Sequence, residues 1–97
     1  MIDVSMLKIE GETCMAMSVQ LPGSPPLLLI VAERGFIMCG FLNIDAAERL
    51  GVVAAVVSGV DSFEDMLNAQ VKAATSKAEA LGVKAGVKGI DALKNMV

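Results

Sequence analysis

Apolar and polar residues alternate along the first part of the chain in a pattern that predicts a β-hairpin. The alternation runs through residues 4–9 and 13–21, and the turn Glu10-Gly11-Glu12 separates the two segments. A period of two places successive side chains on opposite faces of a strand, and a short glycine-containing turn joins antiparallel strands. In the second strand Met15 and Met17 share one face, and Cys14 lies on the face with the smaller and more polar side chains.

Two later segments, residues 27–32 and 36–42, are apolar on both faces and lie on either side of a turn at residues 33–35. Strands of this kind belong to the interior of a sheet that is covered on both sides. The helices of a 97-residue chain can cover one face. The other face is therefore predicted to need a second subunit.

The second half of the chain carries helix signals between short apolar segments. Asp45 with Glu48 matches a capping box, Gly51 ends that helix, and residues 52–57 form another apolar strand. A strand, a short helix and a strand predict a parallel pair with a right-handed crossover. Further capping boxes are predicted at Ser62 with Asp65 and at Ser76 with Glu79, a short strand around residues 71–73, and a last helix over residues 88–96.

These elements predict a single α+β domain over residues 1–97. The expected architecture is a mixed, mostly antiparallel sheet of five or six strands, with short helices packed mainly on one face. Residues 22–26 (PGSPP) form a loop, and they interrupt the longest stretch without charges, residues 13–32, so this stretch is not predicted to span a membrane. The start of the chain does not resemble a signal peptide. We expect a soluble, cytoplasmic protein.

Composition adds an expectation about assembly. The chain is 55% apolar and 20% charged, which is more apolar than an ordinary domain of this size. Burial between subunits accounts for the excess, so the sequence predicts a homo-oligomer, most simply a dimer. Apolar residues scattered over a monomer surface are the alternative.

The missing residue types exclude several kinds of chemistry. The chain has no histidine, tryptophan or tyrosine and only two cysteines, and its net charge is −3. Without histidine, and with two cysteines far apart in sequence, neither a structural zinc site nor a CxxC redox pair is expected. The acidic balance and the three phenylalanines argue against nucleic-acid binding. We expect no cofactor, no metal, no nucleic-acid partner and no membrane partner.

Cys39 is the main candidate for a chemical group. A buried thiol between apolar neighbours is usually core and inert, and this is the first interpretation. Gly40 favours a second one, since a glycine within a strand often marks a bulge that would turn Cys39 toward an opening. A ligand-binding or catalytic site would then form around Cys39. Its candidate neighbours are Arg34, Gly40, Asn43 and Asp45.

The segment LGVKAGVKG, residues 81–89, is a weaker candidate for binding a small anionic ligand. Backbone amides in glycine-rich turns, together with lysines, can hold a phosphate, although the order of a P-loop is absent. The alternative is a tight connection between helices. The candidate anion-binding residues are Lys84, Gly86, Lys88 and Gly89.

The segments GFIMCGFLNID and LGVKAGVKGIDALKNM resemble the YunC-like family of small prokaryotic proteins, a domain of unknown function. The resemblance covers about residues 4–96, and this chain has Lys88 where the family pattern often has Ser or Thr. It implies a fold and a small soluble protein, but no established activity. The residues that carry it most specifically are Gly35, Met38-Cys39-Gly40, Leu42-Asn43, Gly82, Gly86, Gly89 and Ala92-Leu93.

The sequence favours a homo-oligomeric binding or interaction module without catalytic activity, with a small ligand or a protein as its partner. The alternative is an enzyme that depends on the Cys39 thiol or acts on a small ligand near it.

Overall fold

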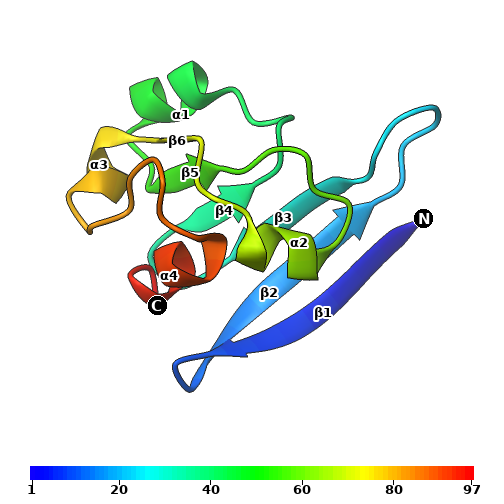
Figure 1. The fold of residues 1–97 in the computed structure, drawn as a ribbon, viewed down its shortest axis with the longest axis horizontal. Coiled ribbons are helices and arrows are strands. Elements are labelled where there is room, and N and C mark those ends of the chain that lie inside the picture. Colours follow the sequence, from blue (N-terminus) through cyan, green and yellow to red (C-terminus); the bar gives the residue numbers. More distant parts are fainter.

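All six strands of the chain join one sheet, and each lies beside the strand that precedes it in the sequence (Figure 1). The computed structural model describes residues 1–97. The predicted α+β architecture is confirmed. The strands are β1 (Ile2–Ile9), β2 (Glu12–Val19), β3 (Leu27–Val31), β4 (Phe36–Met38), β5 (Ala54–Val56) and β6 (Ala73–Ala74).

The first four strands form an antiparallel meander, in which each strand pairs antiparallel with the one before it. Helix α1 (Ile44–Leu50) connects β4 to β5, which therefore run parallel, and β6 pairs antiparallel with β5. The structure confirms the predicted parallel pair joined by a short helix. The predicted strand over residues 36–42 is shorter than expected, because regular pairing ends at Met38.

Three helices and one face of the sheet enclose the main core. These helices are α2 (Phe63–Asn68), α3 (Ser76–Glu79) and α4 (Gly89–Lys94). Buried side chains from each of them join one apolar cluster with alternate residues of the strands. The cluster includes Leu28, Ile30, Ile37, Ala55, Met66, Ala78, Ala92 and Leu93.

Helix α1 covers only a small part of the opposite face. Ala54 and Val56 alternate with Ala55, so they point away from the main core, and both are buried without belonging to its cluster. Ala47 of α1 is likewise buried outside that cluster, and α1 contacts β5. The far side of β5 is therefore covered by α1.

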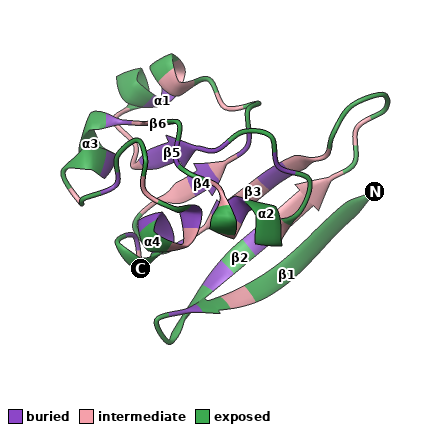
Figure 2. Ribbon diagram, in the orientation of Figure 1, coloured by how far each residue is buried: buried purple, intermediate pink, exposed green.

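The rest of this second face, over β1–β4, has no helix on it, and we call it the open face. It is apolar across all four strands, because the antiparallel register aligns the apolar positions of neighbouring strands in rows. The residues are exposed on β1 and mostly half-buried on the other strands (Figure 2). The open face consists of Ile2, Val4, Met6, Met15, Met17, Val19, Leu27, Leu29, Val31, Phe36 and Met38.

The opposite side of the β1–β2 hairpin is polar where the helices do not reach it. Asp3 pairs with Ser18, and Ser5 pairs with Ala16. Asp3 and Ser5 are exposed. The polar residues of the hairpin thus lie on the side that carries the helices, at the end that the helices do not cover, whereas Ile9, Cys14 and Ala16 on the same side belong to the main core.

Two of the three predicted helix caps are corrected by the structure. Asn43 caps α1 by accepting a hydrogen bond from the Ala46 N–H at 3.1 Å, and Asp45 lies in the first turn. Thr75 rather than Ser76 caps α3. Ser62 caps α2 as expected, with its Oγ accepting from the Asp65 N–H. In each corrected case, a polar residue one or two positions before the predicted one takes the capping role.

Thr75 is the one buried polar side chain of the chain, with 1% of its surface exposed. Its hydroxyl donates to the Val52 carbonyl at 2.7 Å and accepts from the N–H groups of Ala54 at 3.2 Å and Ala78 at 3.3 Å. One donor and two lone pairs are thereby all used. Thr75 links the start of α3 to the residues around the start of β5.

None of the helices combines the length and the apolar character that crossing a membrane requires.

Candidate functional site

The carboxyl ends of the parallel strands β4 and β5 lie side by side, and the chain leaves them in opposite directions. After β4 it continues to α1, which covers the second face, and after β5 it continues to α2, which covers the main core. In sheets with parallel strands, a crevice opens where neighbouring connections diverge in this way, and ligands bind there. This topology directs the search for a site to residues 39–41 and 58–61.

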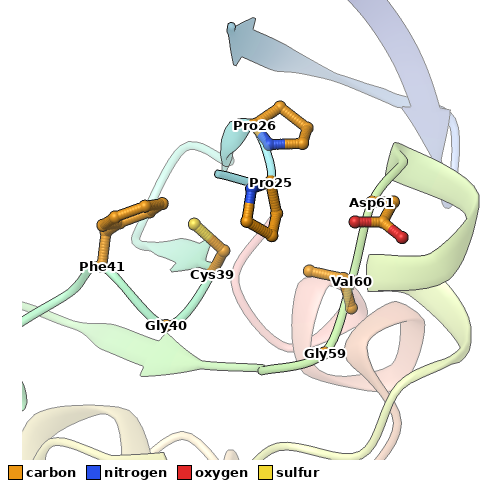
Figure 3. Close-up of a pocket in the computed structure, with 8 residues that line it drawn as sticks. All are labelled: Pro25, Pro26, Cys39, Gly40, Phe41, Gly59, Val60 and Asp61. Carbon is orange, nitrogen blue, oxygen red and sulfur yellow. The ribbon is translucent and has the colours of Figure 1, made fainter. Parts of the chain in front are cut away.

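A cavity of about 400 Å³ lies at this position (Figure 3). Its apolar walls come from the loop before β3, from the segment after β4 and from the loop between β5 and α2. Figure 3 shows the Phe41 ring and Pro25 on either side of the Cys39 sulfur. The residues that line the cavity are Pro25, Pro26, Cys39, Gly40, Phe41, Gly59, Val60 and Asp61.

The position of Cys39 follows from the way in which β4 ends. The Cys39 N–H still donates to the Leu28 carbonyl at 3.1 Å, as an antiparallel ladder requires. The Cys39 carbonyl, however, has turned away and accepts from the Leu42 N–H at 3.1 Å. The Leu28 N–H donates instead to the Cys39 sulfur at 3.3 Å. The thiol thus replaces a backbone acceptor, and this holds its sulfur at the wall of the cavity.

Both interpretations of Cys39 describe part of this geometry. The side chain is 4% exposed and belongs to the main core, as the first interpretation expected. It also lines a cavity that opens to solvent, as the second one expected. A bulge at Gly40 is not the reason, since the strand simply ends at Met38.

Gly40 leaves space in the cavity. A Cβ atom added there would meet only the Ser58 Cβ, at 3.9 Å, which is an ordinary contact, and its backbone does not have a positive φ. A larger side chain can therefore be placed at this position without backbone strain.

A second, more polar depression of about 400 Å³ adjoins the cavity, and the two share Pro26 and Asp61. Asp61 is the one charged residue that lines either of them. It stands at the exposed rim, and its carboxylate points toward Pro25 in Figure 3. The further polar residues of the second depression are Ser18, Gln20 and Ser24. Together the two hollows offer an apolar compartment, a carboxylate and a group of neutral hydrogen-bonding side chains.

Of the predicted neighbours of Cys39, Gly40 alone lines the cavity. Arg34 precedes β4 and so lies at its other end, where its guanidinium donates to the Asn95 carbonyl at 2.8 Å. Asn43 is occupied in capping α1, and Asp45 is exposed in the first turn of that helix. The structure therefore does not gather these residues around the thiol.

The two glycines of the predicted anion-binding set have their N–H groups engaged within the protein. The Gly86 N–H donates to the Val71 carbonyl and the Gly89 N–H to the Ala69 carbonyl. Lys84 and Lys88 are exposed. Gly89 also allows α4 to approach α2, since a Cβ there would overlap the Met66 carbonyl. The geometry accords with a tight connection, and anion binding by the two lysines stays a prediction.

Cys14 differs from Cys39 in its surroundings. It is completely buried in the main core, and both thiols are free. Burial raises the pKa of the Cys14 thiol above its ordinary value, and the nearby Glu12 carboxylate adds to the increase.

Sequence reasoning missed most of the residues that form the cavity. The segment with Pro25 and Pro26 is predicted only as a loop, and Asp61 directly precedes Ser62, the predicted cap of a helix. Nothing local in the sequence shows that both lie beside Cys39. The one available signal was topological, because a parallel pair places the residues that follow both strands at the same edge.

Comparisons with known proteins support the fold over the whole chain. Residues 38–96 match the model of DUF1805, a domain of unknown function. The chain is 32% identical over 101 residues to the uncharacterized protein YunC of Bacillus subtilis, covering 100% of this chain and 99% of that protein. The crystal structure of a protein of unknown function, TA1206 from Thermoplasma acidophilum, superposes with a TM-score of 0.95 at 30% identity. The superposition covers 100% of this chain and 94% of the TA1206 chain.

Proposed function

The chain belongs to the DUF1805 family of domains of unknown function, and we propose that it is a binding module that holds a small ligand in the crevice beside Cys39. The observation that carries this proposal is the cavity at the carboxyl ends of β4 and β5, where the connections diverge to opposite faces. Binding sites in such sheets form at this position.

The lining indicates the class of ligand. Pro25, Phe41 and Val60 offer an apolar surface suited to a ring or a short hydrocarbon chain. Asp61 at the rim favours a cationic group, such as an amine, on the part of the ligand that faces the second depression. We therefore expect a small amphiphilic molecule with an apolar end and an amine end.

The surroundings of Cys39 favour binding over thiol catalysis. A nucleophilic cysteine needs a base or a positive charge close by to generate its thiolate. The cavity is lined by neither lysine nor arginine, and the charge it does have, on Asp61, is negative. The sulfur instead accepts a hydrogen bond from the Leu28 N–H. We assign Cys39 a structural place in the wall, and the two free thiols support a cytoplasmic location.

Nuclear magnetic resonance with simple probes tests the proposal. The uniformly ¹⁵N-labelled protein is titrated with benzylamine, benzyl alcohol and phenylacetate, which share a ring and differ in charge. We expect benzylamine to shift the amide signals of residues 39–41 and 59–61 at the lowest concentrations and phenylacetate at the highest. Shifts scattered over the surface, or a stronger response to phenylacetate, would contradict the proposal.

Two variants with one matched control make this test specific. Gly40→Leu fills the cavity and should abolish the shifts, since a side chain fits at that position. Asp61→Asn keeps the shape and should remove the preference for benzylamine over benzyl alcohol. Ala85→Leu adds the same side chain as the first variant at an exposed position outside the cavity, and it should bind like the wild type.

A further inference from the structure

The open face has the composition of a subunit interface, and its flat area alone is about half of what one partner buries in a stable interface. Strands of 8, 8, 5 and 3 residues give it a flat area of about 380 Å², from a rise of about 3.3 Å per residue and a strand spacing of about 4.8 Å. The relief of the side chains and the surrounding rim add to this value. A stable interface buries about 800 Å² per partner, and a monomer rarely exposes an apolar patch of more than a few hundred Å².

The alternation in the β1–β2 hairpin indicates that the open face is covered in the working protein. A shift of one residue in the strand register would move the apolar side chains to the other face of the sheet. A strand whose apolar residues share one side is therefore suited to burial of that side. In β1 the apolar side includes Val4, which is 53% exposed, and the polar side includes Ser5. Both sides of β1 face water in the isolated chain over residues 2–6, so the apolar side is the one that lacks a cover.

We propose that a second copy of this chain covers the open face, so that two sheets pack face to face as a symmetric dimer. The charge pattern favours this occupant. Lys8, at one end of β1, is the one charged residue of β1–β4 that shares the side of the open face. The face therefore offers nothing to attract a charged partner or an anionic membrane, whereas an identical uncharged surface of equal size matches it.

The side chains of the open face also suit the packing of two identical surfaces. Met6, Met15, Met17 and Met38 lie on it. Methionine side chains are unbranched and adapt to irregular gaps, so two equal faces can interdigitate without a special fit. Aligned sheets pack about 10 Å apart, which is the thickness of an ordinary core. This inference does not depend on the ligand site, because none of the residues of the open face lines the Cys39 cavity.

Two lysine substitutions on neighbouring residues of β1 test the dimer. Val4→Lys places a charge on the open face, and Ser5→Lys places the same charge on the other side of the same strand. Sedimentation equilibrium should give about twice the monomer mass of 10.1 kDa for the wild type and for Ser5→Lys. For Val4→Lys the dissociation constant should rise by about 100-fold or more, because an unpaired charge would be buried. Circular dichroism and thermal unfolding verify that each variant is folded.

Three results would overturn the proposal. The first is a wild-type protein that sediments as a monomer at about 100 μM, well above the range of a stable dimer. The second is a folded Val4→Lys variant that dimerises as tightly as the wild type, since the dimer contact would then lie at the β1 edge or elsewhere and not on the open face. The third is a monomer that binds vesicles of neutral phosphatidylcholine and loses this binding on Val4→Lys, which would make a lipid surface the occupant.

Discussion

Replacing Thr75 with valine should destabilise the protein far more than the small change in size suggests. The two side chains have similar shapes, so the cavity and packing terms stay small. The substitution removes a hydroxyl that makes three hydrogen bonds inside the protein. Its partners, the Val52 carbonyl and the N–H groups of Ala54 and Ala78, then have no replacement, and Ala54 and Ala78 are completely buried.

The expected loss follows from these three groups. Loss of the cap on the Ala78 N–H costs about 1 kcal/mol. The buried Ala54 N–H adds about 1–3 kcal/mol when it is left unpaired, and the Val52 carbonyl, which is only half-buried, adds about 1 kcal/mol. The extra methyl group of valine returns about 1 kcal/mol of burial, so the net loss is about 3 kcal/mol. For a domain of this size, that loss lowers Tm by about 12–24 °C.

Urea unfolding at one fixed protein concentration measures the effect, and Thr75→Ser is the matched control. Serine keeps the hydroxyl and loses only a methyl group, so its cost should stay near 1 kcal/mol. A Thr75→Val variant within about 1 kcal/mol of the wild type would refute the reasoning, because the three partners would then have found other hydrogen bonds. Equal losses in the two variants would also refute it, since the methyl group rather than the hydroxyl would carry the stability.

Three further substitutions or reactions test other parts of the structure. Hydrogen bonds from the Ser76 N–H and hydroxyl lower the pKa of Glu48 in the folded protein. The stability that this carboxylate contributes is present above its unfolded pKa of about 4.3, and it is lost as the pH falls through the lower folded pKa. Glu48→Gln should therefore be less stable than the wild type at pH 7 by a margin that shrinks as the pH falls below about 4.3, and a margin independent of pH would contradict this. Gly89→Ala should lower the free energy of unfolding by about 1–3 kcal/mol despite the better helix propensity of alanine, because its Cβ meets the α2 backbone; chemical denaturation would contradict this if it showed a stabilised variant. Iodoacetamide should modify Cys39 before Cys14 in the native protein, as peptide mass spectrometry can follow, and equal rates would indicate that both react only after unfolding.

The strand pattern of the fold was predictable because it depends on local periodicity. Alternation defined the first hairpin, and the apolar segments at residues 27–32 and 36–42 defined the interior of the sheet. The end of β4 was not predictable, since Phe41 and Leu42 are as apolar as the strand itself. Its end depends on a carbonyl that turns at Cys39, which is a property of the folded backbone.

The caps and the site show the limit of local patterns. Asn43 and Thr75 were missed because each has a polar neighbour that fits a capping pattern equally well, and tertiary packing decides between them. The cavity joins residues 25–26, 39–41 and 59–61, which are distant in sequence. Cys39 and Gly40 were identified as candidates by residue type alone. Pro25, Pro26 and Asp61 could be assigned to the cavity only from the arrangement of the loops in the folded protein.

The agreement between strand order and chain order has a consequence for synthesis on the ribosome. Each strand can pair with the one made just before it, so the meander is able to assemble while the chain is still emerging. The helices that shield Ile30 and Ile37, however, belong to residues 63–97, which are made last. Until then the nascent sheet is apolar on both faces. This protein should therefore depend on chaperones most strongly until residues 63–97 have been made and have packed onto the sheet.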